Sequence, residues 1–277
     1  MLRKPRTVLF GAGRMGRALL RGWAEANCFE PAGSILVIDP NCPEDISELI
    51  RQNSARHAET PKPETFTKLQ TVILAVKPQK FEELAAVIYP MLPDNVLIIS
   101  VAAGVSLEQM EALFGAGPHI RAMPNIAAEV GKAITVICAN ALADNSHIAT
   151  ASNFLKAVGQ VESVQDERLM DAVTAVSGSG PAYFYLMAEA LGAAGQAEGL
   201  PENLAQKLAL QTMIGAGALL ESRKQDTVAA LRAEVTSPGG TTSAALDVMM
   251  GNGAFAEMMR NAVSAATRRS SQLRRPG

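Results

Sequence analysis

The feature that constrains this chain most is a glycine pattern between a short β-branched run and an amphipathic helical stretch. It reads Gly11-Ala12-Gly13-Arg14-Met15-Gly16, and the strand expected before it covers residues 6–10. In such a setting the first glycine makes a tight turn, the second lets the backbone approach a pyrophosphate, and the third packs helix against strand. The pattern predicts a dinucleotide site at a helix N-terminus, with a glycine turn that holds no ligand as the competing interpretation.

The first 165 residues alternate short β-branched runs with amphipathic helical stretches, which is typical of a parallel sheet covered by helices. Strands are expected at residues 6–10, 34–39, 71–76, 96–99, 119–123, 133–138 and 160–164. Ser106 with Gln109 has the spacing of a capping box, and Asp144 is a candidate N-cap. The predicted fold class is α/β, with a Rossmann-type doubly wound, mostly parallel sheet over residues 1–165.

Residues 166–277 contain no further strand pattern, so an all-α domain is expected to follow the sheet. One helix is expected to open at Pro181 and another at Pro201. The second is apolar nearly all round from Leu208 to Leu220, with Gly215 and Gly217 permitting close backbone approach. About 110 residues can hardly surround such a helix, so a second subunit is expected to help cover it, against the alternative of an ordinary monomer core.

Composition narrows the function classes and the location. The 25 basic and 27 acidic residues leave a formal charge of -2, which provides no global electrostatic reason to bind nucleic acid. No apolar run reaches the ~18 residues of a membrane span, and no signal peptide is read at the N-terminus. Three cysteines without CxxC spacing favour a reduced, cytoplasmic compartment, and the scattered histidines lack metal-ligand spacing with them, so no metal site is expected.

Asp39 ends the second predicted strand, at about the distance from the glycines where an acidic residue meets the adenosine ribose. A carboxylate there accepts hydrogen bonds from a free 2'-hydroxyl and repels a 2'-phosphate, so by itself it favours NAD. No arginine follows directly, although Arg14 and Arg51 are candidates to fold toward such a phosphate. The residues leave the choice between NADPH and NADH open.

Further candidate residues follow the other predicted strands, because ligands of an open parallel sheet lie beyond the carboxyl ends of its strands. They are Ala75, Val76, Lys77 and Pro78 after the third strand, Ala102 and Ala103 after the fourth, and Asn125 after the fifth. Lys77 is equally compatible with a solvated lysine, and Asn125 with an ordinary turn.

Two glycine turns mark the helical half, and each is expected to present free N–H groups and hydroxyls at a helix N-terminus. The first comprises Ser177, Gly178, Ser179 and Gly180, and the second includes Gly239, Gly240, Thr241 and Thr242. Such a turn is a ready anion site that suits a substrate carboxylate, with ordinary helix capping as the alternative. Ser179 lacks the GxSxG context of a serine nucleophile, so hydrolase chemistry has little support.

These motifs together resemble the pyrroline-5-carboxylate reductase family. The resemblance covers nearly the whole chain and is carried by residues 11–16, 75–78, 102–105, 121–125, 176–183 and 235–242. It implies an NAD(P)H-binding N-terminal domain, a helical C-terminal domain that forms an interlocked homodimer, and often a higher assembly of dimers. Residues 11–16 and 75–78 would then hold NADP(H), the usual family cofactor, with NAD(H) as the alternative that Asp39 raises.

The resemblance also implies the last step of proline synthesis, in which hydride passes from nicotinamide C4 to the ring C=N carbon of 1-pyrroline-5-carboxylate. Ser177–Gly180 and Gly239–Thr242 would surround the substrate, and Thr242 is the best candidate to hydrogen-bond the ring nitrogen. Two other classes remain open: a hydroxy-acid dehydrogenase on the same architecture, which requires a general base such as lysine, and a non-enzymatic dinucleotide sensor.

Overall fold

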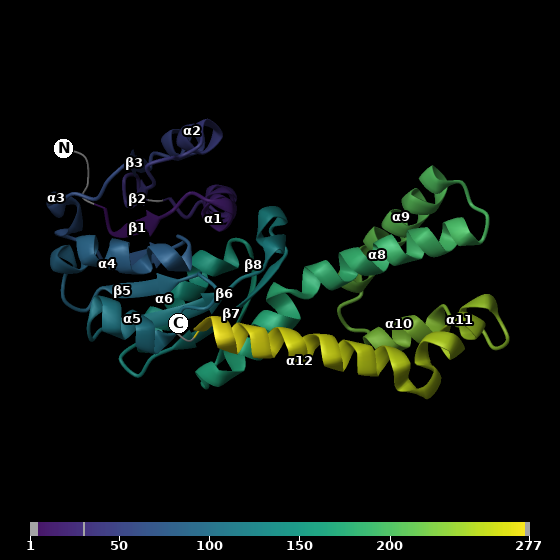
Figure 1. Cartoon of the computed structure of the whole chain (residues 1–277). Helices are drawn as coiled ribbons and strands as arrows, with labels where there is room; N and C mark the ends of the chain where they lie inside the picture. Colours follow the sequence, from purple (N-terminus) through teal and green to yellow (C-terminus); the bar gives the residue numbers. More distant parts are fainter. Residues whose placement is uncertain (1–4, 30, 275–277) are drawn as a thin grey trace. The chain divides into compact units, whose positions relative to one another are not determined.

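An eight-stranded sheet forms the first part of the chain in the computed structural model, which describes residues 5–29 and 31–274 (Figure 1). The strands are β1 (Thr7–Phe10), β2 (Ile35–Ile38), β3 (Arg56–Ala58), β4 (Thr71–Leu74), β5 (Leu97–Ser100), β6 (His119–Met123), β7 (Ala133–Ala139) and β8 (Gly159–Val164). Their order is β3-β2-β1-β4-β5-β6-β7-β8, and every neighbouring pair is parallel except β6 and β7. The predicted doubly wound sheet and its seven strands are confirmed, and β3 is an addition.

Helices cover both faces of this sheet, and the alternation of side chains along each strand divides the core between them. Leu9 faces the layer of α1 (Arg14–Glu25), α2 (Glu44–Gln52) and α6 (Asn145–Lys156). Val8 and Phe10 face the layer of α3 (Pro63–Phe66), α4 (Phe81–Ile88) and α5 (Leu107–Phe114). The fully buried Trp23 ties α1 to α6 by donating its indole N–H to the Phe154 carbonyl at 2.8 Å. The glycine loop therefore rests on a packed, two-sided scaffold.

Both predicted helix caps are present. Ser106 accepts a hydrogen bond from the Gln109 N–H at 3.1 Å, and the Gln109 side chain accepts one from the Ser106 N–H at 2.8 Å. Asp144 accepts from the N–H groups of Ser146 and His147 at the start of α6. The hydroxyl of Ser146 and these N–H groups hold the pKa of Asp144 at about 2. These helix starts follow from local sequence alone.

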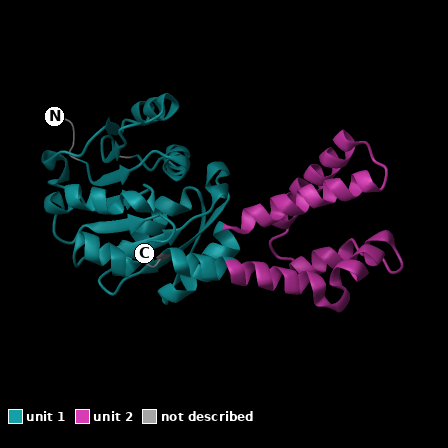
Figure 2. Ribbon diagram, in the orientation of Figure 1, with its two compact units in different colours: residues 1–178, 266–277 teal, residues 179–265 magenta. Residues whose placement is uncertain are grey.

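The chain divides into two compact units, one made of described residues within 1–178 and 266–277 and the other of residues 179–265 (Figure 2). The first unit extends past the expected boundary at residue 165 because a short helical segment packs back on the sheet. That segment contains η4 (Glu167–Leu169), α7 (Met170–Val173) and a π-helical turn (Thr174–Gly178). It is fixed by an ion pair between Arg121 on β6 and Glu167 at 2.8 Å, and by a buried hydrogen bond from Ser270 to Asp171 at 2.9 Å.

The second unit is built from helices, as expected. They are α8 (Gly180–Ala197), α9 (Glu202–Ser222), α10 (Val228–Glu234), α11 (Thr241–Met250) and the first part of α12 (Ala254–Arg274). Helix α9 buries only Ala205 and Ala209 in the single chain, although it is apolar around most of its circumference. Leu208 keeps 49% of its surface exposed and Ile214 keeps 52%. Exposure of this kind marks an interaction surface. None of the described helices has the length and apolarity needed to cross a membrane.

Candidate active site

The predicted cofactor residues converge on one edge of the sheet, at the carboxyl ends of the parallel strands. The chain runs outward in opposite directions from β1 and β4, so the strand order reverses between these two neighbours. Open α/β sheets bind ligands at such a switch point. The loops after β1 and β4 touch there: the Ala75 N–H donates to the Phe10 carbonyl at 2.8 Å. The sequence prediction that residues 11–16 and 75–78 act together is consistent with this geometry.

The three glycines of the loop have separate physical roles. Gly11 has a φ of +97°, and a Cβ there would lie 2.7 Å from the Ala75 carbonyl oxygen. A Cβ on Gly16 would overlap the Gly11 carbonyl oxygen. Gly13, by contrast, has extended backbone angles, and apart from Gly13 and its two chain neighbours no described residue comes within 4 Å of where its Cβ would stand. The empty space before Gly13, at the N-terminus of α1, is a cradle that fits a pyrophosphate.

Asp39, predicted from its position to meet the adenosine ribose, lies against this loop. One carboxylate oxygen accepts the Ala12 N–H at 2.5 Å, and the other accepts the Asn41 N–H at 2.7 Å. The side chain thus joins the end of β2 to the glycine loop. Both oxygens already accept a backbone hydrogen bond, so Asp39 shapes the loop in addition to any contact with a ribose.

A hollow of about 330 Å³ opens beside Asp39 on the side toward α4. Its walls are mostly apolar and include Ile38, Pro40, Val76, Leu84 and Val87. A slot of this kind suits the flat face of an adenine ring. The sequence analysis missed Pro40, Leu84 and Val87; the signal available was their position just beyond β2 and on the helix after β4.

The remaining predicted residues on this edge differ in their surroundings. Val76 contacts the glycine loop, with Cγ1 3.1 Å from a Cβ built on Gly11. Lys77 is exposed and stands just before η1 (Pro78–Lys80), where Pro78 begins the turn. Ala102 is buried and Ala103 exposed after β5. These residues line the path along the strand ends from the glycine loop toward β6.

Asn125 follows β6 and connects this edge to the first predicted substrate segment. Its amide donates to the Ser177 carbonyl at 3.2 Å, and its own Oδ1 is buried without a hydrogen-bond partner among the described residues. The Ser177 carbonyl is available because Pro181, four residues on, has no N–H to donate to it. A buried amide oxygen without a partner is positioned to accept a hydrogen bond from a ligand.

The predicted helix start at Pro181 is confirmed, since α8 begins at Gly180 with Pro181 in its first turn, but the prediction that Ser177–Gly180 forms an open turn before it is wrong. Helical structure already runs from Met170 through the π-helical turn Thr174–Gly178 into α8, and Ser179 at the start of α8 has helical backbone angles. The Ser177 hydroxyl donates to the Val173 carbonyl at 2.9 Å. The segment therefore presents a π-turn, which is common at functional sites, rather than a free helix N-terminus.

The second predicted substrate turn, in the second unit, is a helix N-terminus as expected. Gly240 is the N-cap of α11, and its N–H donates to the Ser237 carbonyl at 3.0 Å, while Gly239 has a φ of +69°. The N–H groups of Thr241 and Thr242 open the helix and lack intrahelical acceptors. Thr242 is half-buried and does not cap α11, because that position belongs to Gly240.

Neither histidines nor cysteines form a catalytic cluster in the part of the chain that the structure describes. His119 bonds the Gly115 carbonyl at 2.9 Å, and His147 belongs to the α6 cap. All three cysteines are free thiols, and no group of three metal-ligating side chains is found among the described residues. Burial raises the pKa of the Cys138 thiol, and the nearby Glu167 carboxylate adds to the effect.

The strand order, the glycine loop and the adjoining slot define a dinucleotide-binding protein of the Rossmann type, joined to a helical unit. The sequence profile described as pyrroline-5-carboxylate reductase dimerisation matches residues 167–273, and one described as NADP oxidoreductase coenzyme F420-dependent matches residues 6–104. The pyrroline-5-carboxylate reductase of Pseudomonas aeruginosa is 36% identical over 270 residues, covering 97% of each chain. The chain belongs to the pyrroline-5-carboxylate reductase family.

Solved structures of the family agree with this assignment. A pyrroline-5-carboxylate reductase from Coxiella burnetii matches with a TM-score of 0.88 and 30% identity over 99% of this chain and 100% of that one. The Plasmodium falciparum pyrroline carboxylate reductase, solved with NADP bound, matches with a TM-score of 0.79 and 27% identity over 99% and 100% of the two chains.

Proposed function

We propose that this chain reduces 1-pyrroline-5-carboxylate to L-proline with NADP(H), the last step of proline biosynthesis. The observation that carries the proposal is family membership over 97% of the chain, combined with an open pyrophosphate cradle in front of Gly13. The Plasmodium falciparum relative was solved with NADP bound, which supports the choice of cofactor.

In this reaction the reduced nicotinamide supplies a hydride to the ring C=N carbon, and the protonated imine nitrogen keeps its proton to become the amine of proline. The protein has to position an already electrophilic ring. We assign the pyrophosphate to the amides at residues 13–16 and the adenine to the slot beside Asp39. The Oδ1 of Asn125 is buried and has no hydrogen-bond partner among the described residues. We assign it the role of accepting a hydrogen bond from the cofactor or the substrate.

For the substrate, we assign the carboxylate to the N–H groups of Thr241 and Thr242 at the start of α11. The Thr242 hydroxyl is the hydrogen-bond partner of the ring nitrogen as the C=N bond is reduced. Ser177–Gly180 are kept in the proposed substrate site, although the Ser177 hydroxyl already donates to the Val173 carbonyl and the Ser177 carbonyl accepts the Asn125 amide.

We also propose a homodimer formed through the helical unit. In the single chain, large apolar side chains of this unit remain exposed, and a partner subunit would cover them. They include Phe184, Tyr185, Leu186, Leu191, Leu210, Ile214, Val248 and Met258. The cytoplasm is the proposed location, supported by the three free thiols.

The test mixes the purified full-length chain with NADPH and the cyclic imine and follows nicotinamide absorbance together with proline formation. Loss of reduced nicotinamide matched by proline supports the proposal. Oxidation of a hydroxy acid by NADP without imine reduction would instead identify a dehydrogenase. Nucleotide binding without turnover of either substrate would identify a sensor.

A further inference from the structure

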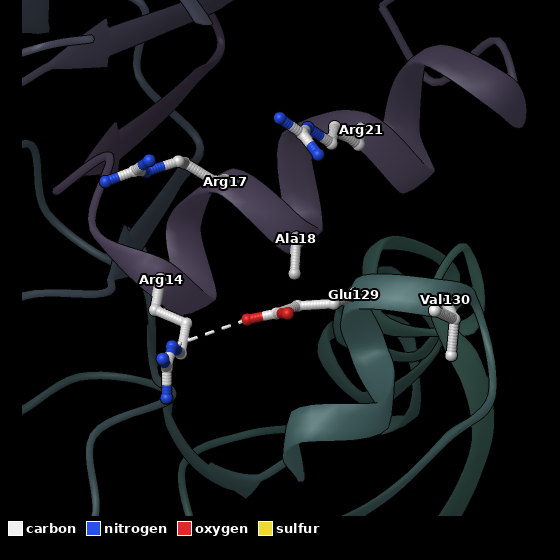
Figure 3. A pocket seen from close by; sticks show the side chains of 6 residues that line it. All are labelled: Arg14, Arg17, Ala18, Arg21, Glu129 and Val130. Atoms are coloured by element: carbon white, nitrogen blue, oxygen red, sulfur yellow. Dashed lines mark ion pairs between the residues drawn. The ribbon is translucent and has the colours of Figure 1, made fainter. Parts of the chain in front are cut away.

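Three arginines lie on one flank of α1, spaced by three and four residues along the helix. Arg14, Arg17 and Arg21 line a hollow of about 400 Å³, which Glu129 and Val130 close from the other side (Figure 3). The hollow adjoins the glycine loop, because Arg14 is the first residue of α1.

Two of these arginines are paired with carboxylates. Arg14 lies 3.4 Å from a carboxylate oxygen of Glu129, and Arg21 lies 2.8 Å from one of Asp45 on α2. Arg17 makes no ion pair with any described residue. Figure 3 shows its side chain pointing away from Glu129, whereas Arg14 points toward it. Arg17 is thus the cation of this row whose charge is not balanced by a neighbour.

The position of Arg17 is fixed by the glycine loop itself. Its Nε donates to the Ala12 carbonyl at 3.2 Å. The backbone N–H of Ala12 in turn donates to the Asp39 carboxylate at 2.5 Å. The Arg17 guanidinium therefore bonds the carbonyl of Ala12, and the Asp39 carboxylate bonds its N–H. In a protein of this fold the adenosine ribose of a dinucleotide lies at this point.

We propose that Arg17 binds the 2'-phosphate of NADP(H) and so offsets the repulsion that Asp39 would otherwise impose. Its two Nη groups remain available to a phosphate while Nε stays on Ala12, and a guanidinium matches phosphate oxygens in a paired geometry. Asp39, with each oxygen already accepting a backbone N–H, is turned to the loop. The proposal rests on the assignment of this loop as the cofactor site.

Three other cations close to this edge of the sheet, Arg14, Arg51 and Lys80, are paired with acids. Arg51 lies 3.5 Å from Glu48 within α2, and Lys80 lies 2.6 Å from Glu83 at the rim of the adenine slot. Arg14 is held by Glu129. Binding a phosphate through any of these would first break an ion pair, whereas Arg17 needs only to keep its present position.

The test compares Arg17→Gln with Arg21→Gln, a matched loss of one arginine from the next turn of the same helix. Isothermal titration with 2'-phospho-ADP-ribose and with ADP-ribose measures the phosphate contribution without turnover. Arg17→Gln is expected to weaken binding of the phosphorylated nucleotide by about tenfold or more and of ADP-ribose by less than about twofold. Arg21→Gln is expected to leave both affinities within about twofold.

Equal weakening of both nucleotides by Arg17→Gln would overturn the proposal, because Arg17 would then only support the glycine loop. Unchanged binding of both would overturn it as well, placing the phosphate elsewhere. Arg17→Lys keeps the charge and provides a second variant if Arg17→Gln unfolds; it is expected to retain part of the preference. Failure of the wild-type protein to bind either nucleotide would instead refute the cofactor assignment.

Discussion

Replacing Gly13 by alanine separates cofactor binding from folding within one loop. Gly13 has φ -68° and ψ -168°, a region open to any L-residue, and no described atom outside Gly13 and its two chain neighbours lies within 4 Å of the added Cβ. As the N-cap of α1, alanine costs about 0.7 kcal/mol relative to glycine. The reduced freedom of the unfolded chain returns about 0.4–1 kcal/mol. The free energy of unfolding should therefore change by less than about 0.5 kcal/mol.

Binding should respond very differently, because the new methyl group occupies the space assigned to the pyrophosphate. Overpacking of this kind costs about 1–3 kcal/mol, which corresponds to a roughly five- to 150-fold weaker affinity. Thermal unfolding and calorimetric titration with NADPH and NADH measure the two effects. Gly16→Ala is the matched control: its Cβ would overlap the Gly11 carbonyl oxygen, so it should lower stability directly. Gly13→Ala with wild-type affinity for both nucleotides would refute the reasoning.

Three further variants test the remaining assignments. Asp39→Ser removes a negative charge and the acceptor of the Ala12 N–H, so it should weaken both cofactors but shift the ratio of kcat/KM values toward NADPH; an unchanged ratio would place Asp39 away from the ribose. Gly217→Leu has open space in the single chain, so the protomer should fold while sedimentation shows a weakened dimer, and a monomeric wild-type protein would contradict the dimer itself. Thr242→Val should lower kcat by about tenfold with cofactor binding intact, and normal turnover would remove its catalytic role.

The sheet could be predicted almost completely because most of its strands are buried, namely β1, β2, β4, β5, β6 and nearly all of β7. A strand such as Thr7–Phe10 is apolar along most of its length, and that signal survives without any knowledge of its neighbours. The exception is Arg56–Ala58, a three-residue edge strand of Arg, His and Ala with partly exposed side chains. Because this strand lies at the edge of the sheet and is only partly buried, its pairing with β2 needs no hydrophobic pattern, and the sequence gives no signal for it.

The structure of Ser177–Gly180 could not be read correctly from local signals. Glycine and serine before Pro181 are typical of a helix start, since proline at the first turn lacks only an N–H that would be unpaired. Pro181 does stand in the first turn of α8, but the residues before it are helical as well, and the Ser177 carbonyl, which receives no N–H from Pro181, accepts the amide of Asn125. Whether a turn or a helix precedes Pro181 depends on whether the preceding residues pack helically against β7, and that is a tertiary effect.

Arg17, the residue proposed to bind the 2'-phosphate, could not be identified from the sequence either, because its role depends on tertiary contacts. The sequence offers Arg14 and Arg51 as candidates to fold toward a 2'-phosphate, but it does not say which cations are already paired with acids. In the structure both arginines face carboxylates, Glu129 and Glu48. Arg17 lies 22 residues before Asp39 in sequence, yet both hold the polar groups of Ala12. An acidic residue at the end of β2 therefore need not exclude a 2'-phosphate when an arginine without an ion pair, Arg17 of α1, is hydrogen-bonded to the same loop.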